Sequence, residues 1–273
     1  MLYLRIITAV CLIPLVIWGI FGLGQGAFAL VSGGLFLLGA WEWTAIAGII
    51  SRPAKFAYCA LFAVIISALF FIQHFCCTQI LFLLNALLWL LPLYWVCRYR
   101  GDKTQYLFPY LLNNRCSKSV MGMFYLALPW LGLNSLHSLP QGAYWVIVLF
   151  LIVWSCDTFA YFIGRQWGKT PLIPFVSPNK TVIGLWGGII GGSAVGLIGF
   201  AVLGHLTVMA VGIIIGTVLL AVLGDLFESL VKRLSQIKDS GTILPGHGGV
   251  LDRIDSLLST LSFFTVCIIG LIK

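Results

Sequence analysis

Residues 206–226 read LTVMAVGIIIGTVLLAVLGDL, and this stretch decides the fold class. Its only charged residue is Asp225, close to its end. About 20 consecutive apolar residues are enough for an α-helix to cross a bilayer. The apolar residues are continuous rather than alternating, which excludes a strand of a membrane β-barrel. We therefore expect a transmembrane helix here.

Similar apolar runs fill most of the chain, at residues 6–23, 27–49, 56–74, 79–97, 119–136, 142–163, 182–203 and 257–272. With 206–226 they predict an all-α, polytopic bundle of about nine transmembrane helices, the first an uncleaved helix rather than a signal peptide. Hydrophobic residues make up 60% of the 273 residues and charged residues 9%, against about 25% charged in soluble domains. This composition excludes a soluble cytosolic enzyme, a disordered chain and a secreted disulfide scaffold.

The basic residues indicate the orientation of the chain in the membrane. Every Lys and Arg except Lys273 precedes the first run or follows the second, fourth, sixth or eighth run. Basic residues favour the cytoplasmic side of a membrane. We therefore expect a cytoplasmic N-terminus and a C-terminus on the far side, and we attribute the net charge of +8 to topology rather than to nucleic-acid binding.

The acidic residues gather in the second half of the chain. Outside residues 157–255 the only acidic residues of the sequence are Glu42 and Asp102. Glu42, which stands alone between two tryptophans, is interpreted as a buried acid paired with a neighbouring helix, with a contribution to the active-site cavity as the alternative. We predict one continuous membrane domain. Residues 1–150 form its scaffold half and residues 151–273 its catalytic half, which contains two cytoplasmic loops at 164–181 and 227–256.

Three segments of the second half carry charged residues in patterns that suit phosphate chemistry. In one of them, Asp225 and Glu228 are three residues apart and Lys232 follows four later, so all three share a helix face. One interpretation is a salt bridge at the helix end. The other is a carboxylate cluster for a hard cation such as Mg²⁺, next to basic groups for phosphate.

Another segment is a glycine-rich loop followed by a helix. Gly248 and Gly249 follow His247, and such a loop presents backbone N–H groups to an anion, close to the positive end of the next helix dipole. Asp252 and Asp255 fall in the first turn of that helix. Capping of the helix is one interpretation of these two acids, and metal binding is the other.

The remaining segment begins at Asp157, near the end of an apolar run. The basic and hydroxyl residues that follow are Arg165, Lys169, Ser177, Lys180 and Thr181. The basic ones suit either snorkelling to the membrane surface or, with the hydroxyl groups, the binding of a polyphosphate. The three segments together favour metal-assisted phosphoryl or nucleotidyl transfer to a lipid at the cytoplasmic face.

Glycines recur every four residues in one apolar run, at Gly184, Gly188, Gly192 and Gly196. On one helix face they let a neighbouring backbone approach closely. We expect tight packing against another helix of the chain, with a dimer interface as the alternative.

Residues 229–255 resemble the signature of the phosphatidate cytidylyltransferases (CDP-diacylglycerol synthases), and the short chain is similar to the bacterial members. The matching pattern is Ser229-x-Val231-Lys232-Arg233, Lys238-Asp239-x-Gly241 and Leu244-Pro245-x-His247-Gly248-Gly249-Val250-x-Asp252-Arg253-Ile254-Asp255. The segments 157–169 and 177–181 also look like the family's. The resemblance implies transfer of the cytidylyl group of CTP to phosphatidate, giving CDP-diacylglycerol and pyrophosphate. It also implies a homodimer in the bacterial cytoplasmic (inner) membrane.

The resemblance further implies roles for individual residues. Asp225 and Asp252 would bind Mg²⁺, with Glu228 and Asp255 as further candidate ligands and a second cation left open. The implied catalytic residues are Asp225, Asp252, Lys232, Arg233 and His247. Those implied to bind CTP or phosphatidate are Asp157, Arg165, Lys169, Ser177, Lys180, Thr181, Ser229, Lys238, Asp239, Gly248, Gly249 and Arg253.

One position departs from the family's pattern, because Ile183 stands where an acidic or amide residue is usual. This departure predicts reduced activity or an altered substrate preference. Three alternatives to the main hypothesis are a CTP-dependent enzyme acting on another lipid phosphate such as an ether lipid, an ion-coupled transporter, and a non-catalytic lipid-binding protein. The clustering of ionisable residues on one face disfavours the transporter.

Overall fold

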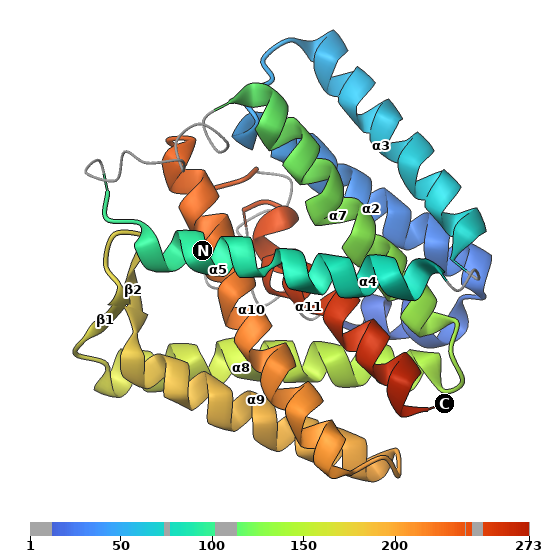
Figure 1. Ribbon diagram of the computed structural model, residues 1–273, viewed down its shortest axis with the longest axis vertical. Helices are drawn as coiled ribbons and strands as arrows, with labels where there is room; N and C mark the ends of the chain where they lie inside the picture. The colour runs from blue at the N-terminus through green and yellow to red at the C-terminus, as the bar shows by residue number, and fades with distance from the viewer. Residues whose placement is uncertain (1–12, 74–76, 102–113, 238, 242–247, 273) are drawn as a thin grey trace.

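The protein is a bundle of long apolar helices in the computed structural model, which describes residues 13–73, 77–101, 114–237, 239–241 and 248–272 (Figure 1). Its elements are α2 (Gln25–Ile46), α3 (Arg52–Ile72), α4 (Cys77–Leu88), α5 (Leu90–Arg98), α7 (Arg115–His137), α8 (Gly142–Trp167), β1 (Pro171–Ile173), β2 (Ser177–Thr181), α9 (Val182–Val202), α10 (Val208–Leu234) and α11 (Leu251–Leu271).

Eight membrane spans are long and apolar enough within the described residues, and α4 and α5 together form one of them. They coincide with eight of the nine predicted runs, so the prediction of a polytopic, all-α membrane protein is confirmed. The described part of the first run is a shorter apolar helix, Ile13–Gly22. The beginning of that run lies outside the described residues.

Helix α11 lies in the middle of the bundle, in contact with α2, α4, α7, α8 and α10. Small polar side chains tie it to its neighbours. The Thr265 hydroxyl donates a hydrogen bond to the Gly132 carbonyl of α7 (3.0 Å), and Asn85 Nδ2 of α4 donates to Ser262 Oγ (2.8 Å). Hydrogen bonds of this kind and close packing drive helix association where the hydrophobic effect is absent. The C-terminal helix is therefore held against helices of the first half of the chain.

Helices α8 and α9 run side by side along their length. A Cβ atom added at Gly188 would lie 2.9 Å from the Cys156 carbonyl oxygen, and one at Gly184 would lie 2.8 Å from that of Ala160. Only glycine, whose side chain is a single hydrogen atom, allows the two backbones to approach so closely. The glycine strip packs against α8 of the same chain, so the prediction of tight intrachain packing is confirmed.

The run predicted at 79–97 is interrupted between α4 and α5, at Trp89. Pro92 lacks an N–H group, and its ring collides with the carbonyl of the residue four positions earlier in an ideal helix. The proline therefore breaks the helix one turn before itself. The predicted run is nevertheless confirmed as one candidate span, Thr78–Arg98, with a local irregularity at Trp89.

Both predicted cytoplasmic loops are partly ordered secondary structure. Instead of a loop over 164–181, α8 continues to Trp167 and β1 pairs antiparallel with β2. Instead of a loop over 227–256, α10 continues to Leu234 and α11 begins at Leu251. The loop boundaries were wrong because an apolar run ends at its first charges, whereas a helix continues while basic side chains such as Lys232 and Arg233 favour its C-terminal end.

Candidate active site

The C-terminal end of α10 carries the predicted row of charged residues. Lys232 Nζ lies 3.4 Å from Glu228 Oε1, one helical turn away. The Glu228 side chain is fully buried, while those of Asp225 and Lys232 remain 31% and 15% exposed. At this helix end a buried carboxylate therefore lies next to a partly exposed ammonium group, which offsets part of the cost of burying the negative charge.

The N-terminal turn of α11 brings Asp252 to the same lysine. Asp252 Oδ1 lies 2.7 Å from Lys232 Nζ. The backbone N–H groups of Gly249 and Ser240 donate to Asp252 Oδ2 at 3.0 and 3.2 Å. Gly248 beside them has φ +82°, in the left-handed region that favours glycine. Both interpretations of Asp252 are therefore consistent with its geometry, because it caps the preceding backbone and also joins the charged cluster.

The β-hairpin supplies a second lysine. Lys180 on β2 forms an ion pair with Asp225 of α10. Its neighbour Thr181 is the N-cap of α9, where the hydroxyl accepts a hydrogen bond from the Gly184 N–H at 3.2 Å. The hairpin thus holds Lys180 over α10, and Thr181 has a structural role at the start of the next helix.

Two further carboxylates complete the cluster. Asp157 of α8 is hydrogen-bonded to Ser256 of α11 and lies close to Asp225 and Asp255. The Asp255 carboxyl in turn lies beside that of Glu228. The members of this carboxylate cluster are Asp157, Asp225, Glu228, Asp252 and Asp255, and the lysines among them are Lys180 and Lys232. The described cluster therefore has more carboxylates than ammonium groups.

The donor set fits a hard cation that shares its coordination with substrate. Mg²⁺ usually takes one or two protein carboxylates together with substrate phosphates and water. The polar neighbours of buried Glu228 include Lys232, 3.4 Å from Oε1, and the Asp255 carboxyl, so its carboxylate lies within the charged cluster. No group of three His, Cys, Asp or Glu residues in the described ranges is arranged to hold a metal by itself. The geometry thus suits a site completed by phosphate oxygens rather than a cage made by protein alone.

Other predicted site residues lie around this cluster or away from it. Arg233 Nε donates to the Val176 carbonyl of the hairpin at 3.3 Å. Arg165 donates to the Tyr161 hydroxyl at 3.0 Å on the exposed side of α8. Among the other predicted site residues, Lys169, Asp239 and Arg253 have exposed side chains, and Ser177 and Ser229 are partly buried. Lys238 and His247 lie outside the described residues.

Two residues near the cluster were not predicted as part of the site. The Tyr125 side chain is buried near Glu228, and its hydroxyl has no hydrogen-bond partner among the described residues. Glu42, 3% exposed, contacts the segment that precedes α11. The one available signal in the sequence was the isolation of Glu42 as an acid within an apolar run.

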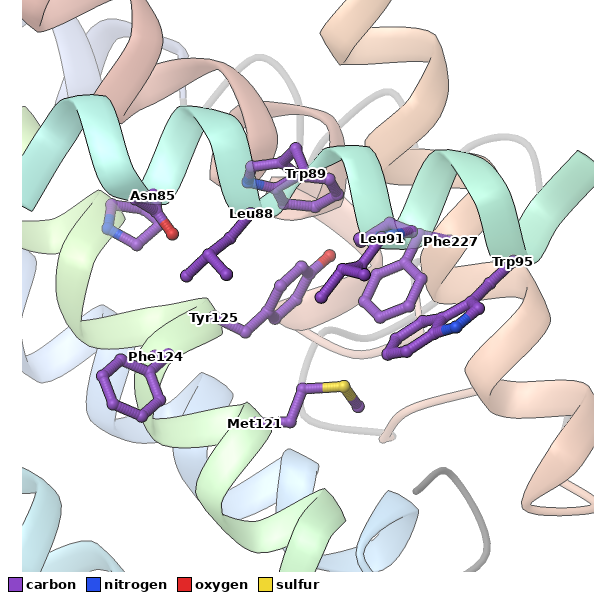
Figure 2. Close-up of a pocket in the computed structure, with 11 residues that line it drawn as sticks. Asn85, Leu88, Trp89, Leu91, Trp95, Met121, Phe124, Tyr125 and Phe227 are labelled. Carbon is purple, nitrogen blue, oxygen red and sulfur yellow. The ribbon is translucent and has the colours of Figure 1, made fainter. Parts of the chain in front are cut away.

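An apolar cavity of about 170 Å³ lies beside the cluster, between α4, α5, α7 and α10 (Figure 2). Tyr125 and Phe227 stand next to each other in its wall, with ring centroids 5.7 Å apart. Phe227 directly precedes Glu228 in α10. The other lining residues are Asn85, Leu88, Trp89, Leu91, Pro92, Trp95, Met121, Phe124 and Pro129. Phe227 and Tyr125 of the cavity wall therefore both lie near Glu228 of the charged cluster.

Comparison with known proteins bears on the chemistry of this arrangement. The model of the cytidylyltransferase family matches residues 3–270. The chain belongs to the cytidylyltransferase family. The match covers the first half of this cytidylyltransferase as well as the second, whereas the sequence motifs lie only within residues 157–255.

Bacterial relatives agree with the family match. A phosphatidate cytidylyltransferase of Pseudomonas aeruginosa is 37% identical over 267 residues, which cover 97% of this chain and 96% of the relative. One of Haemophilus influenzae is 34% identical over 296 residues, covering 97% and 98%. One of Bacillus subtilis is 38% identical over 162 residues, covering 56% and 60%. Membership of the cytidylyltransferase family therefore rests on nearly the whole chain.

Proposed function

We propose that this protein transfers the cytidylyl group of CTP to phosphatidate, giving CDP-diacylglycerol and pyrophosphate. The observation that carries the proposal is the cluster of carboxylates and lysines at the ends of α10 and α11, in a chain that belongs to the cytidylyltransferase family over residues 3–270. The reaction joins two polyanions, so its chief requirement is positive charge held where the phosphates meet.

The chain's own residues divide this work. Lys180 and Lys232 are held by Asp225 and Asp252, and these ion pairs fix both ammonium groups at one site. We assign the two lysines, with Arg233, to the phosphates of the substrates. Mg²⁺ would be held by Asp225 and Asp252, with Glu228 and Asp255 as further candidate ligands and a second cation as an extension of the proposal. When bound, it neutralises phosphate charge and stabilises the departing pyrophosphate.

The chemical step needs no strong base from the protein. Phosphatidate is a phosphomonoester whose second pKa is about 6, so its phosphate is largely dianionic at neutral pH. One of its oxygens attacks the α-phosphorus of CTP, and the bond from that phosphorus to the pyrophosphate oxygen breaks. The ammonium groups orient the phosphates and offset their repulsion. No proton has to be removed from the nucleophile.

The cavity beside Glu228 fits the apolar part of the lipid substrate. It is lined mostly by aromatic and aliphatic side chains, and Tyr125 in its wall lies near Glu228 of the charged cluster. A lipid phosphate needs this combination, with a charged surface for its head group and an apolar surface for its acyl chains. We assign the cavity to a portion of the diacylglycerol.

We also propose an orientation and an assembly for this integral membrane protein. The charged ends of α2, α5, α8 and α10 and the hairpin face the cytoplasm of a bacterial cell, where CTP is available. The N-terminus is then cytoplasmic and the C-terminus on the far side. Residues 1–150 serve as scaffold and 151–273 as the catalytic half of one membrane domain. The protein acts as a homodimer, which cross-linking in native membranes would test.

The experiment that tests the function is release of pyrophosphate by the purified, detergent-solubilised protein. CTP, phosphatidate and Mg²⁺ are supplied together and then each is omitted in turn. Release that requires all three is the expected result. Turnover with an ether-linked lipid phosphate but not with phosphatidate would reassign the acceptor. No turnover with any lipid phosphate, by protein that elutes as a folded species, would contradict the proposal.

Two variants connect that activity to the cluster. Asp252→Asn is expected to raise the Mg²⁺ concentration needed for half-maximal rate and to lower the maximal rate. Lys55→Met is a control, because Lys55 lies at the start of α3 and stacks over Trp41, away from the cluster. Full activity of Asp252→Asn at limiting Mg²⁺ would show that the metal assignment is wrong.

A further inference from the structure

We propose that Glu42 is a positioning residue for the active site. Glu42 holds the segment before α11, described at residues 239–241 and 248–250, so that Asp252 and Lys232 keep their geometry. The proposal rests on the function proposed above. It assigns a role to a residue of the scaffold half that lies outside all three charged segments of the sequence.

The Glu42 carboxylate takes hydrogen bonds from two consecutive backbone groups. The Val250 N–H donates to Oε1 at 3.0 Å, and the Leu251 N–H donates to Oε2 at 2.8 Å. These N–H groups belong to the first turn of α11, where a helix has no partners of its own for its amides and carries the positive end of its dipole. Val250 itself provides no side-chain cap. A carboxylate from α2 therefore caps α11 from a distant part of the chain.

A third hydrogen bond connects Glu42 to Asp252 through one residue. The Ser240 hydroxyl donates to Glu42 Oε2 at 3.3 Å, while the Ser240 N–H donates to Asp252 Oδ2 at 3.2 Å. Ser240 is only 4% exposed. Glu42 and Asp252 thus hold the same short segment from opposite sides, and loss of the first frees the backbone that orients the second.

The glycines of this segment are explained by the same carboxylate. A Cβ atom added at Gly249 would lie 2.6 Å from Glu42 Oε2, and one at Gly241 would lie 2.3 Å from Oε1. Real Cβ atoms do not approach other atoms so closely. Glycine at these two positions therefore serves close approach to Glu42, in addition to any contact with an anion.

The end of α2 that carries Glu42 is itself fixed on both sides. The indole N–H of Trp43 donates to the Lys118 carbonyl of α7 at 2.9 Å. The Ser235 hydroxyl, just after α10, donates to the Ile46 carbonyl at 2.9 Å. These contacts fix the end of α2, and Glu42 can therefore hold the residues that orient Asp252.

The test compares Glu42→Gln with Trp43→Phe. Glutamine keeps the size of the side chain but replaces one acceptor oxygen by an NH₂ group that faces backbone N–H groups. Phenylalanine removes one buried hydrogen bond from the next residue of the same helix without touching the segment before α11. Thermal unfolding in detergent measures what each substitution costs in stability.

We expect Glu42→Gln to lower kcat and to raise the half-saturating Mg²⁺ concentration, each by about tenfold to a hundredfold, as is typical for residues that orient ligands. Amide hydrogen exchange at Val250 and Leu251 should become faster, with or without substrates. Glu42→Asp should recover part of both effects. Trp43→Phe should change stability but leave Mg²⁺ dependence and exchange at these two amides unchanged.

Exchange is measured on protein without substrates, so it remains informative if the enzyme uses another lipid phosphate. Unchanged exchange and unchanged Mg²⁺ dependence in Glu42→Gln would overturn the proposal. An equal loss of activity in Trp43→Phe would also overturn it, because the effect would then be structural. If Glu42→Gln does not fold, Glu42→Asp replaces it, and faster exchange at Val250 and Leu251 in that variant supports the proposal while wild-type exchange overturns it.

Discussion

Lys232 connects the two helices of the charged cluster. Its Nζ lies 3.4 Å from Glu228 Oε1 and 2.7 Å from Asp252 Oδ1. Breaking a buried ion pair by removing one partner leaves an uncompensated charge, at a cost of about 3–5 kcal/mol in soluble proteins. Here one lysine faces two carboxylates, both largely buried. Its loss should therefore affect folding as well as catalysis.

We predict that Lys232→Met lowers the thermal unfolding temperature and abolishes CTP-dependent turnover. Lys232→Arg should keep the stability, since a guanidinium group also pairs with both carboxylates. Unfolding followed by intrinsic tryptophan fluorescence and pyrophosphate release are the two measurements, with Lys55→Met as the control. A Lys232→Met protein as stable as wild type would show that Glu228 and Asp252 do not depend on this ammonium group.

Ile183 is the residue at which the chain departs from its family's usual pattern. It is 43% exposed in the first turn of α9, two residues after the Thr181 cap. Acidic side chains are favoured in the first turn of a helix. We predict that Ile183→Glu is at least as stable as wild type and increases kcat/KM for CTP or phosphatidate. Unchanged or lower kcat/KM would mean that the polar side chain at this position is not needed here.

At the scale of elements, the pair α8 and α9 depends on its glycine strip. We predict that Gly188→Ala destabilises the protein by about 1–3 kcal/mol, because its Cβ would lie 2.9 Å from the Cys156 carbonyl and the helices would have to separate. Gly212→Ala in α10 is the matched control, with nothing within 4 Å of its added Cβ. The control should be neutral or stabilising by up to about 1 kcal/mol, since alanine is the better helix former. Denaturation in detergent compares the two.

The apolar cavity on which lipid binding is proposed to depend lies where α4 meets α5, beside α7 and α10. We predict that Met121→Trp fills this space and raises the KM for phosphatidate about tenfold or more, while the KM for CTP changes little. Met209→Trp is the control, because Met209 is 51% exposed and does not line the cavity. Equal KM values for phosphatidate in both variants would show that the acyl chains bind elsewhere.

Comparison of the elements with the sequence shows which features local sequence patterns can predict. Hydropathy predicted eight spans that the structure contains, because apolar length is a local property of the chain. The spacing of Asp225, Glu228 and Lys232 predicted a shared helix face for the same reason. The pairing of Lys180 with Asp225 and of Glu42 with the N-terminus of α11 depends on how distant helices pack, which no local pattern encodes.

At the scale of the whole molecule, the first half of the chain does more than support the second. Sequence motifs confine the chemistry to residues 157–255, although the family match extends over residues 3–270. The structure brings Glu42 of α2 to the first turn of α11 and Tyr125 of α7 beside Glu228. Both lie outside the charged segments of the second half, so a search for clusters of charged residues in the sequence does not find them.

The proposed orientation of the whole molecule rests on the distribution of its basic side chains along the chain. The basic side chains lie at the ends of α5, α8 and α10, at the starts of α3, α7 and α11, and on β2 just before α9, and these positions alternate along the chain as one membrane face requires. We predict that alkaline phosphatase inserted at 139–141 or at 203–207 is active outside the cytoplasm. The same enzyme inserted at 48–51 or in the hairpin after Ile173 should be inactive, while a cytoplasmic reporter such as green fluorescent protein gives the opposite pattern. Activity at the hairpin site would put the carboxylate cluster on the side of the membrane that lacks CTP, and it would therefore contradict the orientation and the proposed reaction together.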